Sequence, residues 1–130
     1  MSGINIPEQL FYTESHEWVQ IDGEIVTIGI TDYAQSELGD VVFVEVPDVG
    51  EAVKREESFG TIEAVKTVED LLSPATGEVV EANESLGDHP ELMNKDPYGA
   101  GWIIRIRAED PGELDELLNA SEYRDLLGEK

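Results

Sequence analysis

The sequence predicts a mainly β fold, a sandwich of two short-stranded antiparallel sheets with small helices at the C-terminus. Three observations point to it: many short runs rich in Val, Ile and Thr, turn residues between those runs, and a leucine-rich tail with helical spacing. A length of 130 residues suits one domain, which we place over residues 1–130. Within it we expect a core over about 11–108 and a helical cover over about 111–128.

The N-terminal part is predicted to form a hairpin followed by a short helix. Asp22-Gly23 is a two-residue turn signal between the runs 18–21 and 24–30, which indicates an antiparallel pair of strands. Thr31-Asp32 then supplies an N-cap for a short helix, and Gly39 ends that helix.

Further strands are predicted from β-branched content and alternation. They lie over residues 40–46, 52–55, 58–64, 68–72, 78–82 and 102–107, with one helical turn within 91–93. In the last of these strands Ile104 and Ile106 share one face and are expected in the core. The arginines that alternate with them are expected to neutralise neighbouring carboxylates on the other face.

The C-terminal tail is predicted to form two helices that cover a sheet. Pro111 is suited to the first position of a helix, and Ser121 is suited to cap a second one. The apolar residues of the first helix are Leu114, Leu117 and Leu118, and those of the second are Tyr123, Leu126 and Leu127. We interpret both stripes as core packing.

The charge balance is strongly acidic. Eight basic and 30 acidic residues give a formal net charge of −22, which argues against nucleic acid and membrane surfaces as partners. Basic partners or a salt-rich solvent are consistent with this net charge.

No secretory signal, transit peptide or membrane span is evident, so we expect a cytoplasmic protein, monomeric on its own. Cysteine is absent, which excludes disulfides and thiolate metal sites.

Histidine and adjacent acids do not suggest a catalytic or metal site. His16 fits a hydrogen-bonded structural role on the strand that carries Trp18, and His89 is expected to be exposed in a turn. Two separated histidines without thiols are a poor transition-metal site. The pairs Glu56-Glu57 and Glu69-Asp70 do not form a hydrolase's acid and base, because neighbours on a strand point to opposite faces.

Lys66 has an unusual position among only four lysines. It lies between two strand-like runs, 61–65 and 68–72, so the sequence predicts it at a tight hairpin turn with its ammonium exposed. On this local feature alone, an ordinary surface lysine is the simpler interpretation.

The string over residues 58–80 resembles the swinging-arm domains that carry biotin or lipoate on a lysine. Glu63, three residues before Lys66, and Gly77, eleven after it, match the frame of that superfamily. Biotin carriers usually have methionines on both sides of the lysine, whereas this chain has Val65 and Thr67. The Asp-Lys-Ala core of 2-oxo-acid dehydrogenase lipoyl domains is also absent. The Glu-x-Val-Lys form is similar to H proteins of the glycine cleavage system.

Ordered motifs far from the lysine extend this resemblance over roughly residues 11–127. They are Ser15-His16-Glu17-Trp18-Val19, the run 29–47, Pro90-Glu91-Leu92 with Asn94, Asp96-Pro97-Tyr98-Gly99, Gly101-Trp102, Glu113-Leu114 with Leu117-Leu118, and Glu122-Tyr123. Ala64 stands where the family usually has Ser, and the extreme acidity is not a general family trait.

The resemblance implies a barrel-sandwich hybrid fold with lipoate attached to Lys66 through an amide. It implies that Glu63 and Gly77 are recognised during lipoylation. It also implies that the loaded arm folds into a surface cleft, where Ser15, Glu17 and Asp70 occupy the matching motif positions. A carboxylate there can form a charge-assisted hydrogen bond to a protonated amine.

The resemblance further implies a carrier without catalytic activity of its own. It would take the aminomethyl group of glycine from the pyridoxal-phosphate decarboxylase to the tetrahydrofolate-dependent aminomethyltransferase, and its dithiol to dihydrolipoamide dehydrogenase. Lipoate-attaching enzymes are the remaining implied partners. The alternative is a protein that relays lipoate to other enzymes or serves sulfur metabolism, and an independent enzyme is the least favoured interpretation. Whether genes for the three partner enzymes lie nearby separates the first two.

Overall fold

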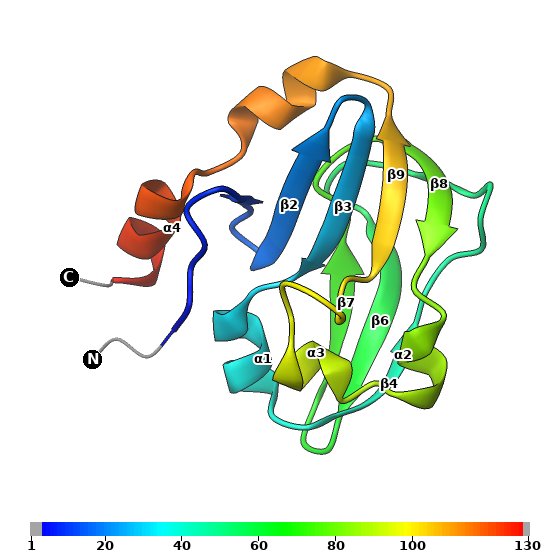
Figure 1. The fold of residues 1–130 in the computed structure, drawn as a ribbon, viewed down its shortest axis with the longest axis vertical. Coiled ribbons are helices and arrows are strands. Elements are labelled where there is room, and N and C mark those ends of the chain that lie inside the picture. Colours follow the sequence, from blue (N-terminus) through cyan, green and yellow to red (C-terminus); the bar gives the residue numbers. More distant parts are fainter. Residues whose placement is uncertain (1–3, 129–130) are drawn as a thin grey trace.

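The structure, a computed structural model, describes residues 4–128 and consists of two antiparallel sheets (Figure 1). The larger sheet has the order β1 (Phe11–Tyr12), β2 (Glu17–Asp22), β3 (Ile25–Ile30), β9 (Ile104–Ala108), β8 (Gly77–Ala82), β5 (Ala52–Val53). The smaller sheet has the order β4 (Val41–Glu45), β6 (Ser58–Ala64), β7 (Val68–Leu72). The predicted mainly β fold of two short-stranded antiparallel sheets is therefore confirmed.

Most predicted strands occur, and β6 and β7 have the predicted bounds. The first hairpin differs by one residue, because Asp22 still pairs with Ile25 and the loop is Gly23-Glu24. Gly23 has φ +64°, which glycine adopts without steric cost. The pairing therefore places the glycine at the first loop position. His16 lies in the turn before β2, not on the strand as predicted.

The core lies between the two sheets and is formed by the strand residues whose side chains point inward. Ile104 and Ile106 of β9 are fully buried, as predicted. Burying such a side chain stabilises the fold by about 1.5–3 kcal/mol.

On the opposite face of β9, the side chain of Arg105 pairs with that of Glu81 at 2.6 Å. Arg107 approaches Glu78 at 3.6 Å, so the expected neutralisation of neighbouring carboxylates is present across the β8–β9 pair.

Three short helices gather at the end of the molecule that carries the β6–β7 hairpin (Figure 1). They are α1 (Asp32–Leu38), α2 (Ser85–Asp88) and α3 (Leu92–Lys95). Thr31 caps α1 by accepting a hydrogen bond from the backbone N–H of Ala34, and Gly39 is the C-cap, as predicted. Asn94 of α3 donates to the Gly39 carbonyl at 2.7 Å and accepts from the Val41 N–H at 2.9 Å. The helix α2 was not predicted.

The C-terminal cover departs from the predicted helices in two details. The segment from Pro111 is a 3₁₀ helix, η1 (Pro111–Glu116), so Leu117 and Leu118 lie beyond its end. The last helix, α4 (Ala120–Leu127), is capped by Asn119 and not by Ser121. The Asn119 side chain accepts from the Glu122 N–H while the Glu122 side chain accepts from the Asn119 N–H. This reciprocal capping box satisfies two backbone N–H donors at the start of α4. Ser121 lies inside the helix, one residue after its first residue, and is therefore not the cap.

A second hydrophobic cluster joins this cover to the larger sheet. Tyr123 of α4 stacks on Tyr12 with ring centroids 4.7 Å apart, and both side chains are fully buried. Trp18 is buried in the same cluster and donates its indole N–H to the Pro97 carbonyl at 2.8 Å.

In the part of the chain that the structure describes, no helix is both long and apolar enough to cross a membrane.

Candidate functional site

Lys66 is presented at the tip of the β6–β7 hairpin. The Ala64 N–H donates to the Thr67 carbonyl at 2.8 Å and closes the turn. The Val65 N–H donates to the Asp40 carbonyl at 3.0 Å, which fastens the tip to the chain just before β4. The lysine itself is exposed. Its stem passes close to Gly39, because a methyl group at Gly39 would lie 3.5 Å from Cε of Lys66.

A cleft of about 500 Å³ lies beside this lysine. It is enclosed by the turn before β2, by α1 and by the hairpin. The cleft contains four of the residues that the sequence singled out: Lys66, Ser15, Glu17 and Asp70. Its other walls are Ile30, Tyr33, Ala34, Leu38, Ile62 and Leu71, with His16, Glu37, Thr67 and Glu69. The structure thus brings together, in one hollow, residues more than 50 positions apart in the chain.

Glu17 is the buried acid of this cleft, with 2% of its surface exposed. Its Oε1 accepts the Thr13 hydroxyl at 2.6 Å, and its Oε2 accepts the Leu72 N–H at 3.4 Å. Burial raises the pKa of the Glu17 carboxyl to about 7, and hydrogen bonds from Thr13, Leu72 and Ser15 only partly offset that rise. Glu17 therefore changes its protonation near neutral pH.

The turn that carries Ser15 and Glu17 is held by contacts that the sequence did not reveal. His16 has φ +72°, a left-handed conformation in which histidine is enriched among non-glycine residues. Its Nδ1 lies 2.8 Å from the Tyr123 hydroxyl, which also lies 2.8 Å from Oγ1 of Thr31. Burial lowers the pKa of His16. The expected structural, hydrogen-bonded histidine is thus present, and α4 supports the cleft through it.

Asp70 and Glu63 lie at the margin of the site. Asp70 is an exposed residue of the edge strand β7 and lines the cleft. Glu63 is exposed on β6, three residues before Lys66, and pairs with Val68 across the hairpin. Asp70 lies four residues after Lys66, so the two acids belong to the two strands of the hairpin that carries the lysine.

Gly77 lies elsewhere. It begins β8, which starts at the end of the molecule opposite the β6–β7 hairpin (Figure 1). It is buried and pairs with Ala108 of β9. A side chain at Gly77 would overlap the carbonyl oxygen of Arg107. This close strand contact explains by packing why glycine stands at this position.

Replacing Gly77 with alanine is expected to lower the free energy of unfolding by about 1–3 kcal/mol, because the added methyl group forces β8 and β9 apart. Urea unfolding followed by circular dichroism measures this change. Gly87→Ala is the matched control, since a methyl group at Gly87 meets no atom within 4 Å. Equal stability of Gly77→Ala and the unmodified chain would contradict the packing explanation.

Replacing Glu17 with glutamine is expected to change how stability depends on pH. Unfolding returns the Glu17 pKa from about 7 to its ordinary value near 4.5, so the unfolded state releases a proton that the folded state retains between these values. The unsubstituted chain therefore loses stability as the pH rises through this range. From about pH 5 to pH 8, the stability of Glu17→Gln relative to the parent should rise by about 2–3 kcal/mol.

Urea unfolding at both pH values in the same concentrated salt measures this difference. The exposed neighbour Glu14, replaced by glutamine, controls for the loss of one negative charge. A parallel pH dependence in the Glu17→Gln and Glu14→Gln variants would show that burial does not hold the Glu17 proton.

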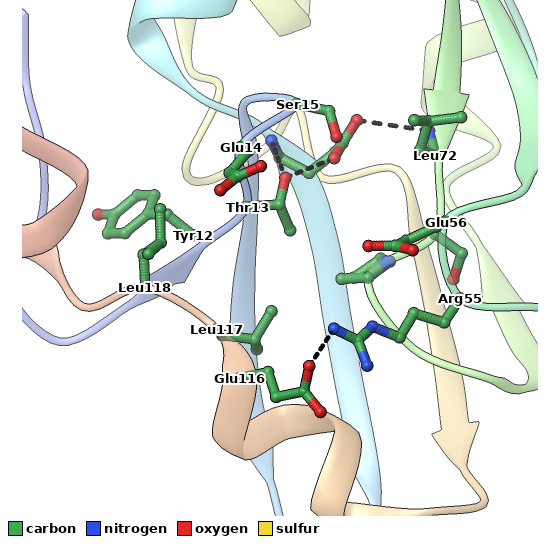
Figure 2. Close-up of a pocket in the computed structure, with 13 residues that line it drawn as sticks. Tyr12, Thr13, Glu14, Ser15, Arg55, Glu56, Leu72, Glu116, Leu117 and Leu118 are labelled. Atoms are coloured by element: carbon green, nitrogen blue, oxygen red, sulfur yellow. Dashed lines mark hydrogen bonds and ion pairs between the residues drawn. The ribbon is translucent and has the colours of Figure 1, made fainter. Parts of the chain in front are cut away.

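A second cleft of about 370 Å³ lies next to the same turn (Figure 2). Ser15 and Glu17 line both clefts. The second cleft is bounded on its far side by Arg55, which pairs with Glu116 of η1 at 2.6 Å. It contains no lysine, so the cleft beside Lys66 is the one suited to an acylated lysine.

Comparison with known proteins gives a consistent assignment. The family model "Glycine cleavage H-protein" matches residues 10–130. The glycine cleavage system H protein of Geobacillus kaustophilus is 53% identical over 126 residues, which cover 97% of this chain and 99% of that protein. The H protein of Nostoc punctiforme is 56% identical over 118 residues, which cover 91% of this chain and 92% of that protein.

The fold agrees with these sequence matches. The crystal structure of a glycine cleavage system H protein from Mycobacterium marinum superposes with a TM-score of 0.87 at 45% identity, covering 95% of this chain and 99% of that one. Two antiparallel sheets, an exposed hairpin lysine and an adjoining cleft accompany that match. The chain therefore belongs to the glycine cleavage H-protein family, whose members are carrier subunits and not catalysts.

Proposed function

We propose that this chain carries lipoate as an amide on Lys66 and holds the loaded end of that arm in the adjoining cleft. The observation that carries the proposal is the placement of an exposed hairpin lysine at the edge of a cleft that contains a buried carboxylate, Glu17. An exposed tip gives an attaching enzyme access to the amine. The cleft gives the completed arm a place to rest between transfers.

The residues around Lys66 fit the lipoyl group. Acylation removes the charge of the lysine, and the aliphatic walls of the cleft, Ile30, Leu38, Ile62 and Leu71, suit an uncharged hydrocarbon arm. When bound, lipoate supplies the dithiolane sulfurs that accept the aminomethyl group, which a chain without cysteine lacks. The protein supplies the attachment point, the apolar wall and the acid.

Glu17 is the residue that we assign to the cargo's amine. Its carboxyl is buried, and this burial raises its pKa to about 7 although hydrogen bonds from Thr13, Leu72 and Ser15 lower it in part. An ammonium group beside it would favour the carboxylate and form a charge-assisted hydrogen bond. Ser15 and Asp70 line the same cleft, and we assign them supporting contacts with the arm. A cargo held against Glu17 is also shielded from water.

The partners follow from this role. We propose that the carrier meets the glycine decarboxylase, the aminomethyltransferase and dihydrolipoamide dehydrogenase in turn, and a lipoate-attaching enzyme before them. Glu63 is our candidate for recognition during attachment because it is exposed on the same hairpin as Lys66. Gly77, buried in β8, is proposed to act only by keeping the fold that this enzyme recognises. The cytoplasm is the proposed compartment, because reducing conditions there keep a dithiol available.

Reconstitution with purified partners tests this function. The chain is lipoylated in vitro, and its mass is expected to rise by one lipoyl group that peptide mapping assigns to Lys66. Only the lipoylated form should support glycine-dependent exchange of carbon dioxide by the decarboxylase and formation of methylenetetrahydrofolate by the transferase. Lipoylation without either activity would favour a lipoate relay instead.

A further inference from the structure

A buried hydroxyl group joins two walls of the cleft beside Lys66. It belongs to Tyr123 of α4, whose side chain is fully buried. The hydroxyl oxygen lies 2.8 Å from Nδ1 of His16, in the turn before β2, and 2.8 Å from Oγ1 of Thr31, the residue that caps α1. The turn and α1 both enclose the cleft, whereas Tyr123 does not line it. One side chain of the C-terminal helix thus holds two cleft walls from behind.

The turn needs this support because of its backbone conformation. Its chain reversal is tight, since the His16 N–H donates to the Thr13 carbonyl at 3.1 Å and the Thr13 N–H donates to the Glu17 carbonyl at 3.0 Å. His16 has a φ of +72°. This left-handed conformation is unfavourable for a residue with a Cβ atom and persists only where surrounding contacts hold it. The ring of His16 lies between those of Tyr33 and Tyr123, with centroid distances of 4.8 and 5.7 Å.

The position of the Glu17 carboxyl group depends on this turn. The Thr13 hydroxyl, at the other end of the turn, donates to the carboxyl at 2.6 Å. The Thr31 N–H donates to the His16 carbonyl at 3.0 Å, so the turn is also tied to the start of α1. A change of φ at His16 rotates the chain next to Glu17 and moves its carboxyl group relative to α1. Because hydrogen bonds weaken steeply as their geometry departs from the optimum, such a movement weakens any bond from Glu17 to an amine in the cleft.

We propose that the Tyr123 hydroxyl is a positioning group for the cargo: by holding His16 and Thr31, it keeps Glu17 where its carboxyl group meets the amine at the end of the arm. This inference rests on the proposed function. Tyr123 lies outside the cleft, so it acts on the cargo through Glu17. The C-terminal helix then determines how long the carrier retains its cargo, in addition to covering the sheet.

Two stacked tyrosines allow a matched test of this role. Tyr123 and Tyr12 are both fully buried, with ring centroids 4.7 Å apart. The Tyr12 hydroxyl donates to the Pro7 carbonyl at 2.6 Å, and neither of these residues lines the cleft beside Lys66. Tyr123→Phe and Tyr12→Phe each remove one buried hydroxyl group and keep the stacked ring. A general loss of stability therefore affects both variants, whereas a loss of positioning affects Tyr123→Phe alone.

Amide hydrogen exchange tests the support of the turn in the chain without lipoate. The N–H groups to follow are those of Thr13 and Thr31, which are bonded to carbonyls of the turn. Both are expected to exchange about fivefold faster in Tyr123→Phe than in Tyr12→Phe, because the loss of one buried hydrogen bond has an effect of this size. Equal exchange in the two variants overturns the positioning role.

Retention of the cargo tests the link to Glu17. The lipoylated carrier is loaded by the decarboxylase from glycine labelled at its methylene carbon and is then separated from that enzyme. Release of ammonia and labelled formaldehyde by water is followed over time. Tyr123→Phe is expected to release the label about fivefold faster than the parent and Glu17→Gln about tenfold faster, with Tyr12→Phe equal to the parent. In the Glu17→Gln background, Tyr123→Phe should cause no further increase, because it acts through that carboxyl group.

The outcomes separate this inference from the function on which it rests. A full additional effect of Tyr123→Phe in the Glu17→Gln background shows a general disturbance of the fold and overturns the positioning role. Equal release by Tyr123→Phe and the parent, with faster release by Glu17→Gln, overturns the positioning role alone. Failure of the lipoylated parent to take up the label, or equal release by Glu17→Gln and the parent, overturns the proposed function itself.

Discussion

Replacing Lys66 with arginine is expected to abolish lipoylation and carrier activity and to leave the fold intact. Arginine retains a positive charge on an exposed turn, but its guanidinium is protonated at all working pH values and does not attack an activated acyl group. Neither core cluster contains Lys66, so the melting temperature should not change. Intact mass after incubation with a lipoate-attaching enzyme, and the decarboxylase exchange assay, measure the two losses.

Lys54→Arg is the matched control for this substitution, because Lys54 is also exposed but lies outside both clefts. It should accept one lipoyl group and support glycine cleavage at the parent rate. Lipoylation of the Lys66→Arg chain, or glycine cleavage by it, would show that another group carries the arm. A large fall in melting temperature would instead show that the hairpin lysine has a structural role.

The parts of the site that sequence reasoning identified are those with local signals. The hairpin around Lys66 follows from β-branched runs on both sides of it, and both strands have the predicted bounds. The helix α1 follows from the Thr31 cap and the Gly39 end, each a preference of single residues. Placing Ser15, Glu17 and Asp70 near one another needed the family resemblance, because no local pattern relates them.

The features that sequence reasoning missed depend on tertiary contacts. Glu17 looks like any of 30 acidic residues, and its raised pKa arises only because packing of the β2 turn against β7 removes water. The support of His16 by Tyr123 joins residues 107 positions apart. Asn119 and Ser121 are both good cap residues, and only the reciprocal bonds with Glu122 decide between them. The packing role of Gly77 likewise appears only when β9 is placed beside it.

Raising potassium chloride from low to molar concentration is expected to raise the melting temperature steadily. The formal charge of −22 on 14.4 kDa causes the acidic side chains to repel one another in the folded state. Eight basic side chains are too few to offset the repulsion among 30 acidic ones. The four arginines pair with Glu8, Glu78, Glu81 and Glu116, and most other acids are left to repel one another. Salt shortens the screening length to ~3 Å near 1 M. Thermal unfolding at increasing salt measures the effect.

Two explanations of the acidity differ in this experiment. Adaptation to a salt-rich solvent predicts a melting temperature that still rises well beyond physiological salt. Steering of basic partners predicts association that weakens over the same range, with little change in stability after the first screening. We favour adaptation, because the acids are dispersed along the chain and not gathered around Lys66. Neutralising exposed acids that lie outside both clefts and outside the hairpin, as in Asp22→Asn, Glu24→Gln and Glu109→Gln together, should therefore reduce the salt dependence. A melting temperature that is flat from low to molar salt, with partner affinity falling, would leave steering as the explanation.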